Sequence, residues 1–179
     1  MKYLLILLLS FFVFSCNHIK TEDEVASSSE FKNQQTEHRG AIDLIELGQQ
    51  ILYCMQDKIT FKQLTNYIPN QEDIKQLYVI TKTPIDTTNI RINAELALKK
   101  IAAGFGNAKN DGILQEFEWK NVKMENVTSQ LMPNEIINSK HVYWNLTVNN
   151  KNYRLTAKCM QIGNYWFLGE DLHFNITGL

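Results

Sequence analysis

The periodicity of the hydrophobic residues changes once along this chain, near Gly112, and this change limits the folds that the chain can adopt. Between residues 42 and 104, apolar side chains recur at the spacing of one face of a helix. After Gly112 they alternate with polar residues, as in a strand with one buried face. Helices followed by successive strands favour an α+β fold, in which N-terminal helices pack on an antiparallel sheet.

The helical part is predicted to hold successive helices separated by capping residues. Thr60 and Asn70 precede the second and third helices, where their side chains can accept hydrogen bonds from the first turn. The fourth helix is expected to open at Thr88 or Asn89 and to end at Gly104. The apolar residues that carry the pattern are Ile42, Ile45, Ile51, Leu52, Met55 and Ile59 in the first helix, opposite polar residues that include Gln56, and Ile92, Leu96 and Ile101 in the fourth.

The second half of the chain is predicted to form consecutive strands. Residues 113–127 read as a long strand with a bulge between Trp119 and Val122, where the apolar positions change phase. Residues 142–148 alternate next, and tight turns at 149–150 and 163–164 join the following strands into an antiparallel meander. The return strand carries Tyr153, Leu155, Ala157 and Cys159 on its core face, and the last strand runs from Tyr165 to Phe174.

The N-terminus has the composition of a secretory leader. Lys2 is followed by an apolar run from Leu4 to Phe14 that only Ser10 interrupts. This run is too short to cross a hydrocarbon core of about 30 Å, but it has the length of the hydrophobic region of a cleaved leader. The run stops just before Cys16, after which the sequence becomes polar at once.

The segment Val13-Phe14-Ser15-Cys16 resembles the lipobox of bacterial lipoproteins. The resemblance implies that residues 1–15 are removed and that the Cys16 thiol receives a diacylglyceryl group, with a further acyl chain on the freed amine. Several acyl chains anchor a protein stably, whereas one chain holds it only marginally. Asn17 does not resemble the Asp that retains many lipoproteins in the inner membrane, so the outer membrane is favoured. The alternative is an ordinary leader that leaves a free thiol near the cleavage site.

The rest of the chain divides into a tether and a domain. Residues 16–39 are rich in Lys, Glu, Asn, Gln and Ser, and they are predicted to be disordered because they offer little apolar surface to bury. Residues 40–179 suffice for a single domain. Lys and Arg number 18 against 19 Asp and Glu, without a basic run, which gives little support for nucleic-acid binding.

Two segments of this domain carry a resemblance to a known superfamily. They are Ile51–Ile68, and an ending in which the alternating strand from Tyr153 is followed by a Gly turn and Trp166. In these features the domain resembles the cystatin-like superfamily called nuclear-transport-factor-two-like. The resemblance implies a curved sheet around an N-terminal helix, forming a cone whose mouth can hold a hydrophobic ligand, a catalytic site or a partner peptide. Enzymes of this superfamily place Asp, Tyr or His inside the cone. No sequence motif assigns such a role here, but the residues of these types that could fill it are Asp57, Tyr53, Tyr67, Tyr143 and His141.

Motifs for metal binding or nucleophilic catalysis are not found in the sequence. It contains no His-Glu-x-x-His, no Cys-x-x-Cys and no Gly-x-Ser-x-Gly, and its His residues share no close spacing with one another. We therefore expect no metal, no cofactor and no enzymatic activity.

The two cysteines of the domain leave two alternatives open. Cys54 on the first helix and Cys159 on a late strand could meet where helix packs on sheet, and in an oxidising periplasm a disulfide could join them. The alternative, which the frequent burial of free Cys favours, is a pair of inert buried thiols.

Aromatic residues provide the remaining signal for a binding site. As alternating strand residues, most of them are expected first in the core and second in the lining of a pocket. The residues predicted to contact a ligand, if there is one, are Tyr53, Trp119, Trp144, Tyr153 and Trp166.

These features favour a non-enzymatic, membrane-anchored envelope lipoprotein whose domain binds a protein partner or an apolar small molecule. One alternative is a periplasmic immunity-type lipoprotein that neutralises a toxin, and another is an isomerase or hydrolase with its site in the cone. A filled cone with an exposed apolar patch would favour the binding protein. A deep, polar-lipped cavity with Asp57 or a Tyr pointing inward would favour the enzyme.

Overall fold

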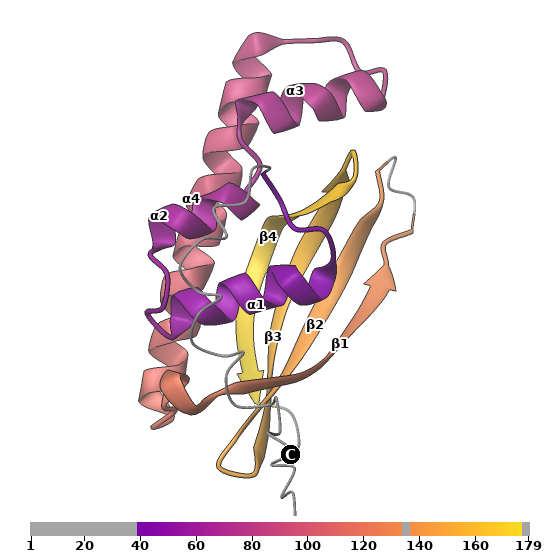
Figure 1. Ribbon diagram of the computed structural model, residues 1–179. Helices are drawn as coiled ribbons and strands as arrows, with labels where there is room; N and C mark the ends of the chain where they lie inside the picture. The colour runs from indigo at the N-terminus through magenta and orange to yellow at the C-terminus, as the bar shows by residue number, and fades with distance from the viewer. Residues whose placement is uncertain (1–38, 134–136, 177–179) are drawn as a thin grey trace, which may run out of the picture. The chain divides into compact units, whose positions relative to one another are not determined.

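Helices cover one face of a four-stranded antiparallel sheet whose strands follow one another in the order β1-β2-β3-β4 (Figure 1). The computed structural model describes residues 39–133 and 137–176. The predicted leader, Cys16 and nearly all of the tether lie outside the described residues. The α+β class with N-terminal helices on an antiparallel meander is confirmed. The strands are β1 (Lys123–Leu131), β2 (Ser139–Val148), β3 (Lys151–Ile162) and β4 (Tyr165–Ile176).

Helix α1 (Leu44–Met55) crosses the inner face of the sheet (Figure 1). The Asp43 side chain caps it by accepting hydrogen bonds from the backbone N–H groups of Ile45 and Glu46. Leu47, Ile51 and Met55, spaced four residues apart, are fully buried against the strands.

Two details of the predicted first helix are wrong. Ile42 and Ile45 were expected in the core but are 66% and 56% exposed, because the helix begins only at Leu44 and turns another side to the sheet. Gln56 was expected on the polar side but is buried, and its Nε2 donates to the carbonyl of Val122 at 3.0 Å. That hydrogen bond offsets part of the cost of burying the amide.

The short helices that follow begin where the capping pattern predicts. Thr60 and Gln63 form a capping box at the start of α2 (Phe61–Leu64), which continues as the 3-10 turn η2 (Thr65–Tyr67). Asn70 and Asp73 form the same arrangement at the start of α3 (Gln71–Ile80).

The predicted end of the fourth helix at Gly104 is wrong. Helix α4 runs from Thr87 to Leu114 and lies along β4 (Figure 1). A Cβ at Gly104 would lie 2.6 Å from the backbone oxygen of Leu172. The glycine therefore permits close packing of helix on strand, and this packing outweighs the poor helix propensity of the glycines and asparagines beyond it.

The predicted strand 113–127 is also wrong in its first half. Residues 113–114 belong to α4, and Trp119–Asn121 form the 3-10 turn η3, in which the Trp119 ring packs against Gly112. The register shift lies between Met124 and Asn126, not between Trp119 and Val122.

The meander itself agrees with the prediction. β2 and β3 alternate buried and half-buried residues, and their turn places Asn149 and Asn150 at positive φ. Asn tolerates this left-handed conformation, which matches the twist of a two-residue hairpin. The sheet thus has one face under the helices and one polar outer face.

The closest helix–sheet approach generates a stability prediction. A Cβ at Gly48 would lie 2.1 Å from Cδ1 of the fully buried Trp144, whereas a Cβ at Gly106 meets nothing within 4 Å. Gly48→Ala should lower the free energy of unfolding by about 1–3 kcal/mol because the core is overpacked. Gly106→Ala should raise it by up to about 1 kcal/mol because alanine favours the helix. Urea denaturation of both variants measures the difference, and shifts of the same sign would contradict this packing.

Candidate functional site

Four of the five predicted ligand-contacting aromatic residues, all except Tyr53, are buried in the core. Trp144 is fully buried under α1, where its Nε1 donates to the carbonyl of Leu44 at 2.7 Å. Trp119 and Tyr153 meet in one aromatic cluster through the rings of Phe117 and Phe174, with centroids 4.5–5.5 Å apart. Side chains thus fill the interior between α1 and the sheet.

The other two predicted contacts lie apart from this cluster. Trp166 is buried at the start of β4, where Lys140 lies over its ring at 4.9 Å from the centroid. Tyr53 is half-buried on α1, and its hydroxyl accepts a hydrogen bond from Gln49. The structure does not bring the five residues to one cavity, and their contact with a ligand stays a prediction.

The residues considered for catalysis are also dispersed. Asp57 has a 73% exposed side chain and pairs with Lys109 at 2.6 Å. Tyr67 is buried in the core, while Tyr143 and His141 lie on the outer face of β2, where Arg154 packs over the Tyr143 ring. Within residues 39–133 and 137–176, no three His, Cys, Asp or Glu side chains are placed to hold a metal ion.

Cys54 and Cys159 are separate thiols in the structure, so the disulfide that the sequence left open is not present. Both side chains are enclosed by the core. Burial raises the pKa of the Cys54 thiol to about 11 and also raises that of the Cys159 thiol. Both thiols are therefore protonated and unreactive near neutral pH.

A groove lies between the hairpin that α3 and α4 form and strands β3 and β4, since residues of all four elements line it. We call it the hairpin groove. Its volume is about 260 Å³, and Gln76 of α3 lies against Gly163 in the β3–β4 turn beside it. The groove is lined mainly by apolar side chains, with polar ones at its rim: Pro69, Ile74, Leu77, Tyr78, Leu96, Ala97 and Met160, together with Asn93, Lys100, Gly169 and Glu170.

The α3–α4 hairpin has a small core of its own. Ile74, Ile90 and Ala94 are buried between the two helices, and Asn93 donates to the Tyr78 hydroxyl at 3.0 Å. This core fixes α3 relative to α4, so the roof of the groove is preformed. Arg39 supports the start of α3 from the other side by pairing with Asp73 at 3.0 Å.

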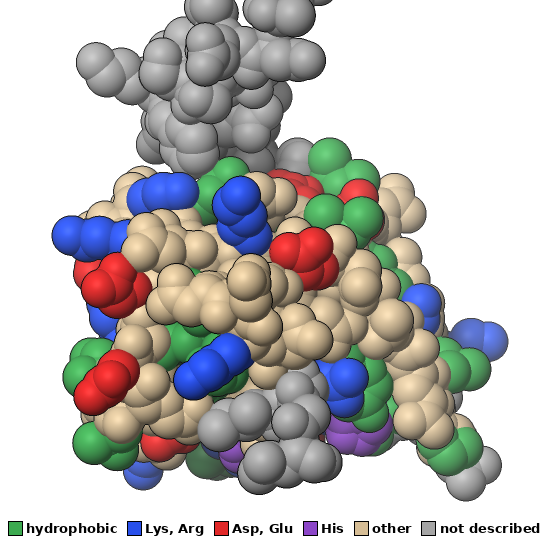
Figure 2. All heavy atoms as spheres, turned by 90° about the horizontal axis from the view of Figure 1, so that it is seen from below, with side chains coloured by type: hydrophobic (Ala, Val, Ile, Leu, Met, Phe, Trp, Pro, Cys, Tyr) green, Lys and Arg blue, Asp and Glu red, His purple; other side chains and the backbone are tan. Residues whose placement is uncertain are grey.

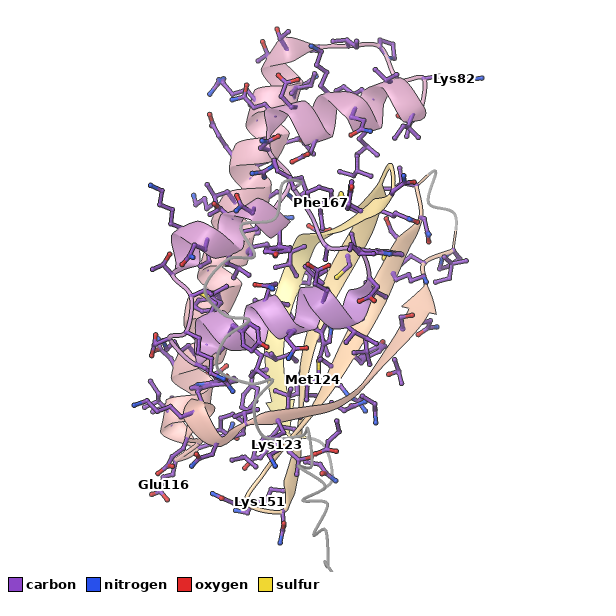
Figure 3. All side chains as sticks on the ribbon, in the orientation of Figure 1. Lys82, Glu116, Lys123, Met124, Lys151 and Phe167 are labelled. Carbon is purple, nitrogen blue, oxygen red and sulfur yellow. The ribbon has the colours of Figure 1, made fainter. Side chains whose placement is uncertain are left out.

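Large apolar side chains remain exposed on the same hairpin. Lys82, in the loop that joins the helices, points away from the body of the molecule (Figure 3). The opposite end, seen in Figure 2, carries charged side chains of both signs with apolar side chains between them. The exposed apolar residues of the hairpin are Val79, Ile80, Ile85, Ile92 and Leu96, and we call them the hairpin patch.

The hairpin patch and the hairpin groove were not predicted from the sequence. Ile92 and Leu96 were placed on the buried side of their helix, yet they are 39% and 47% exposed. One signal could have found it: residues 77–80 are four consecutive apolar residues at the end of a helix. Such a run faces all sides of the helix, so part of it must remain outside the core.

Ionised side chains close one end of the groove. Glu170 accepts a hydrogen bond from Lys100 of α4 and lies 3.6 Å from Nζ of Lys158 on β3. The hydrogen bond from Lys100 lowers the pKa of Glu170 below its ordinary value, against the opposing effect of burial, and raises the pKa of Lys100. The pair therefore ties the hairpin to the sheet.

No protein-family model matches the chain, and no curated protein or solved structure is significantly similar to it. The description of the hairpin groove therefore rests on its geometry alone.

The ion pair at the groove predicts a pH-dependent stability. Because Glu170 has a lowered pKa in the folded state, its pairing stabilises the fold above the ordinary carboxyl pKa and is lost as the pH falls through the folded-state pKa. Glu170→Gln should lower the unfolding free energy by up to about 1 kcal/mol at pH 7 and by almost nothing near about pH 3. Glu116→Gln, at a residue below the end of α4 (Figure 3), is the matched control and should change little at either pH. A pH-independent loss in Glu170→Gln would contradict the assignment.

Proposed function

We propose that this protein is a non-enzymatic lipoprotein of the bacterial cell envelope, whose domain binds a protein partner or an apolar ligand at the hairpin groove. The observation that carries the binding role is the filled interior combined with an apolar groove and exposed apolar residues on one hairpin. A stable domain gains nothing in folding from leaving such side chains in water, so they are explained best by an external partner.

The anchor rests on the sequence. The apolar run from Leu4 to Phe14 ends at Cys16 in the order that resembles a lipobox, and this order supplies the thiol for acylation. No helix in the part of the chain that the structure describes is long and apolar enough to cross a membrane. In our proposal, acyl chains on Cys16 hold the domain at the outer membrane through the tether.

The dimensions of the groove limit what it can hold. A cavity of about 260 Å³ is slightly smaller than the usual small-ligand site, whose volume begins at about 300 Å³. It can take a short acyl or aromatic group, or one or two apolar side chains of a partner protein. The hairpin patch around it would then contact the remainder of that partner. Leu96 belongs to both the groove and the patch and thus connects the two surfaces.

An isomerase or hydrolase is less well supported. Asp57 faces solvent, is paired with Lys109 and does not line the hairpin groove. General acid–base catalysis requires such groups within hydrogen-bond reach of one substrate. The binding role needs only the apolar surfaces that the fold presents.

The anchor gives a direct prediction. Cys16→Ser should abolish incorporation of radiolabelled palmitate and should leave the chain uncleaved or released from the membrane, because the acylated thiol is lost. Labelling and membrane fractionation of the wild-type and variant chains measure this. Undiminished label in Cys16→Ser would reject the lipoprotein assignment.

The groove gives a second prediction. Leu96→Asp should weaken binding of the apolar fluorescent probe anilinonaphthalene sulfonate by roughly tenfold, because it places a charge where an apolar side chain lines the groove. Leu114→Asp is the matched control, since Leu114 is 82% exposed and lies outside the groove. Fluorescence titration compares the two variants. Equal affinities would show that the probe binds elsewhere and would contradict the proposed site.

A further inference from the structure

Strand β1 is the outermost strand on one side of the sheet (Figure 1). On the opposite side, Ala41 pairs with Trp166 of β4 and α4 lies along that strand. No strand among the described residues pairs with the outer edge of β1. A long open edge exposes backbone hydrogen-bonding groups and can pair with another chain.

The hydrogen-bonding pattern shows which residues of β1 face this edge. The backbone N–H of Met132 donates to the carbonyl of Ser139 on β2, and the register from Asn126 to Leu131 is unbroken. In an antiparallel ladder, successive residues turn their backbone groups alternately to the two neighbours. The N–H and C=O groups of Val127, Ser129 and Leu131 therefore point away from β2.

The two halves of β1 differ in how well they are protected against pairing with a strand of another chain. The first half carries Lys123 and Glu125 and is interrupted by the register shift before Asn126 (Figure 3 labels Lys123 at its start). Charges and bulges of this kind discourage edge pairing. The segment from Val127 to Leu131 has neither charge nor proline, so the second half of the edge lacks these protections.

The side chains of this second half complement a copy of themselves. When two β1 strands run antiparallel about a two-fold axis at Ser129, Val127 lies opposite Leu131 of the other copy, and Thr128 lies opposite Gln130. Leu131 is 64% exposed, and Val127 is partly buried on the inner face. Apolar side chains thus face apolar ones, and uncharged polar side chains face uncharged polar ones. The outward backbone groups of Val127, Ser129 and Leu131 face those of the same three residues in the other copy.

We propose that the partner of this edge is a second copy of the chain, paired antiparallel through residues 127–131 about an axis at Ser129. The two sheets then continue into one, with about six backbone hydrogen bonds between the strands. The contact is short and falls below the area of a stable dimer, about 1,000 Å², so the pairing is weak in dilute solution. Confinement of both copies to one membrane would strengthen it, and this step alone rests on the proposed anchor.

Site-directed cross-linking of the full chain in membranes tests the pairing. In Ser129→Cys the two Cα atoms would lie about 5.5 Å apart, within the range of a disulfide. In Glu125→Cys, an equally exposed position on the same strand, the two copies of the residue would lie too far apart to bond. Under mild oxidation we expect Ser129→Cys dimers to form at least about tenfold faster than Glu125→Cys dimers. Adding Leu131→Lys to Ser129→Cys should slow cross-linking severalfold, because it places a charge opposite Val127.

Equal rates at positions 129 and 125 would overturn the pairing, as would a Leu131→Lys variant that cross-links unchanged. A cross-linked product containing a different protein would assign the edge to another partner and would also overturn it. Cross-linking of the wild-type chain distinguishes a failure of the edge pairing from a failure of the proposed anchor. The described thiols of that chain, Cys54 and Cys159, are buried, so a wild-type dimer would reveal a free thiol at Cys16 and would reject acylation, not edge pairing.

Discussion

The contact between Gly48 of α1 and the indole of Trp144 on β2 determines how the rest of this fold is arranged. Glycine at this position lets the helix approach the sheet closely, since any side chain would overlap the ring. The indole N–H donates to the carbonyl of Leu44, one of the first residues of the same helix, so the largest buried side chain carries no unsatisfied donor. Because helix and sheet meet this closely, the space between them is filled by packed side chains. Gly104 and Gly112 repeat the arrangement on α4, against Leu172 and Trp119.

In our proposal, recognition takes place on the outside of the domain, because side chains fill the interior. Four of the five aromatic residues predicted to contact a ligand are buried in the core, where they pack against other core side chains. The α3–α4 hairpin, in contrast, has a separate small core and leaves apolar side chains exposed beside a groove. The Lys100–Glu170 pair and the contact between Gln76 and Gly163 hold this hairpin to the sheet. A rigid, preformed apolar surface of this kind lowers the entropic cost of binding.

Residues with local signals were predicted well from the sequence. The capping boxes at Thr60 and Asn70, the Asn149–Asn150 turn and the alternation in β2 and β3 all depend on near neighbours in the chain. The errors arose where distant contacts decide the structure. Gly104 resembles a helix stop in the sequence, but in the structure its missing side chain lets Leu172 pack closely against α4. Residues 113–114 were expected in a strand but continue α4, where the Trp119 ring packs on Gly112. The hairpin groove could not be predicted because its walls come from α3, α4, β3 and β4, and only the fold brings them together.

The central claim is that the interior is closed and that the hairpin groove receives the ligand. The indole N–H groups of Trp119 and Trp144 report on the interior, while the backbone amides of Leu77 and Leu96 report on the groove. A heteronuclear NMR titration with an apolar probe observes all of them at once. The account predicts shifts at the amides of Leu77 and Leu96 and unchanged indole signals. Shifts of the indole signals with unchanged amides at Leu77 and Leu96 would contradict it and would place binding between α1 and the sheet.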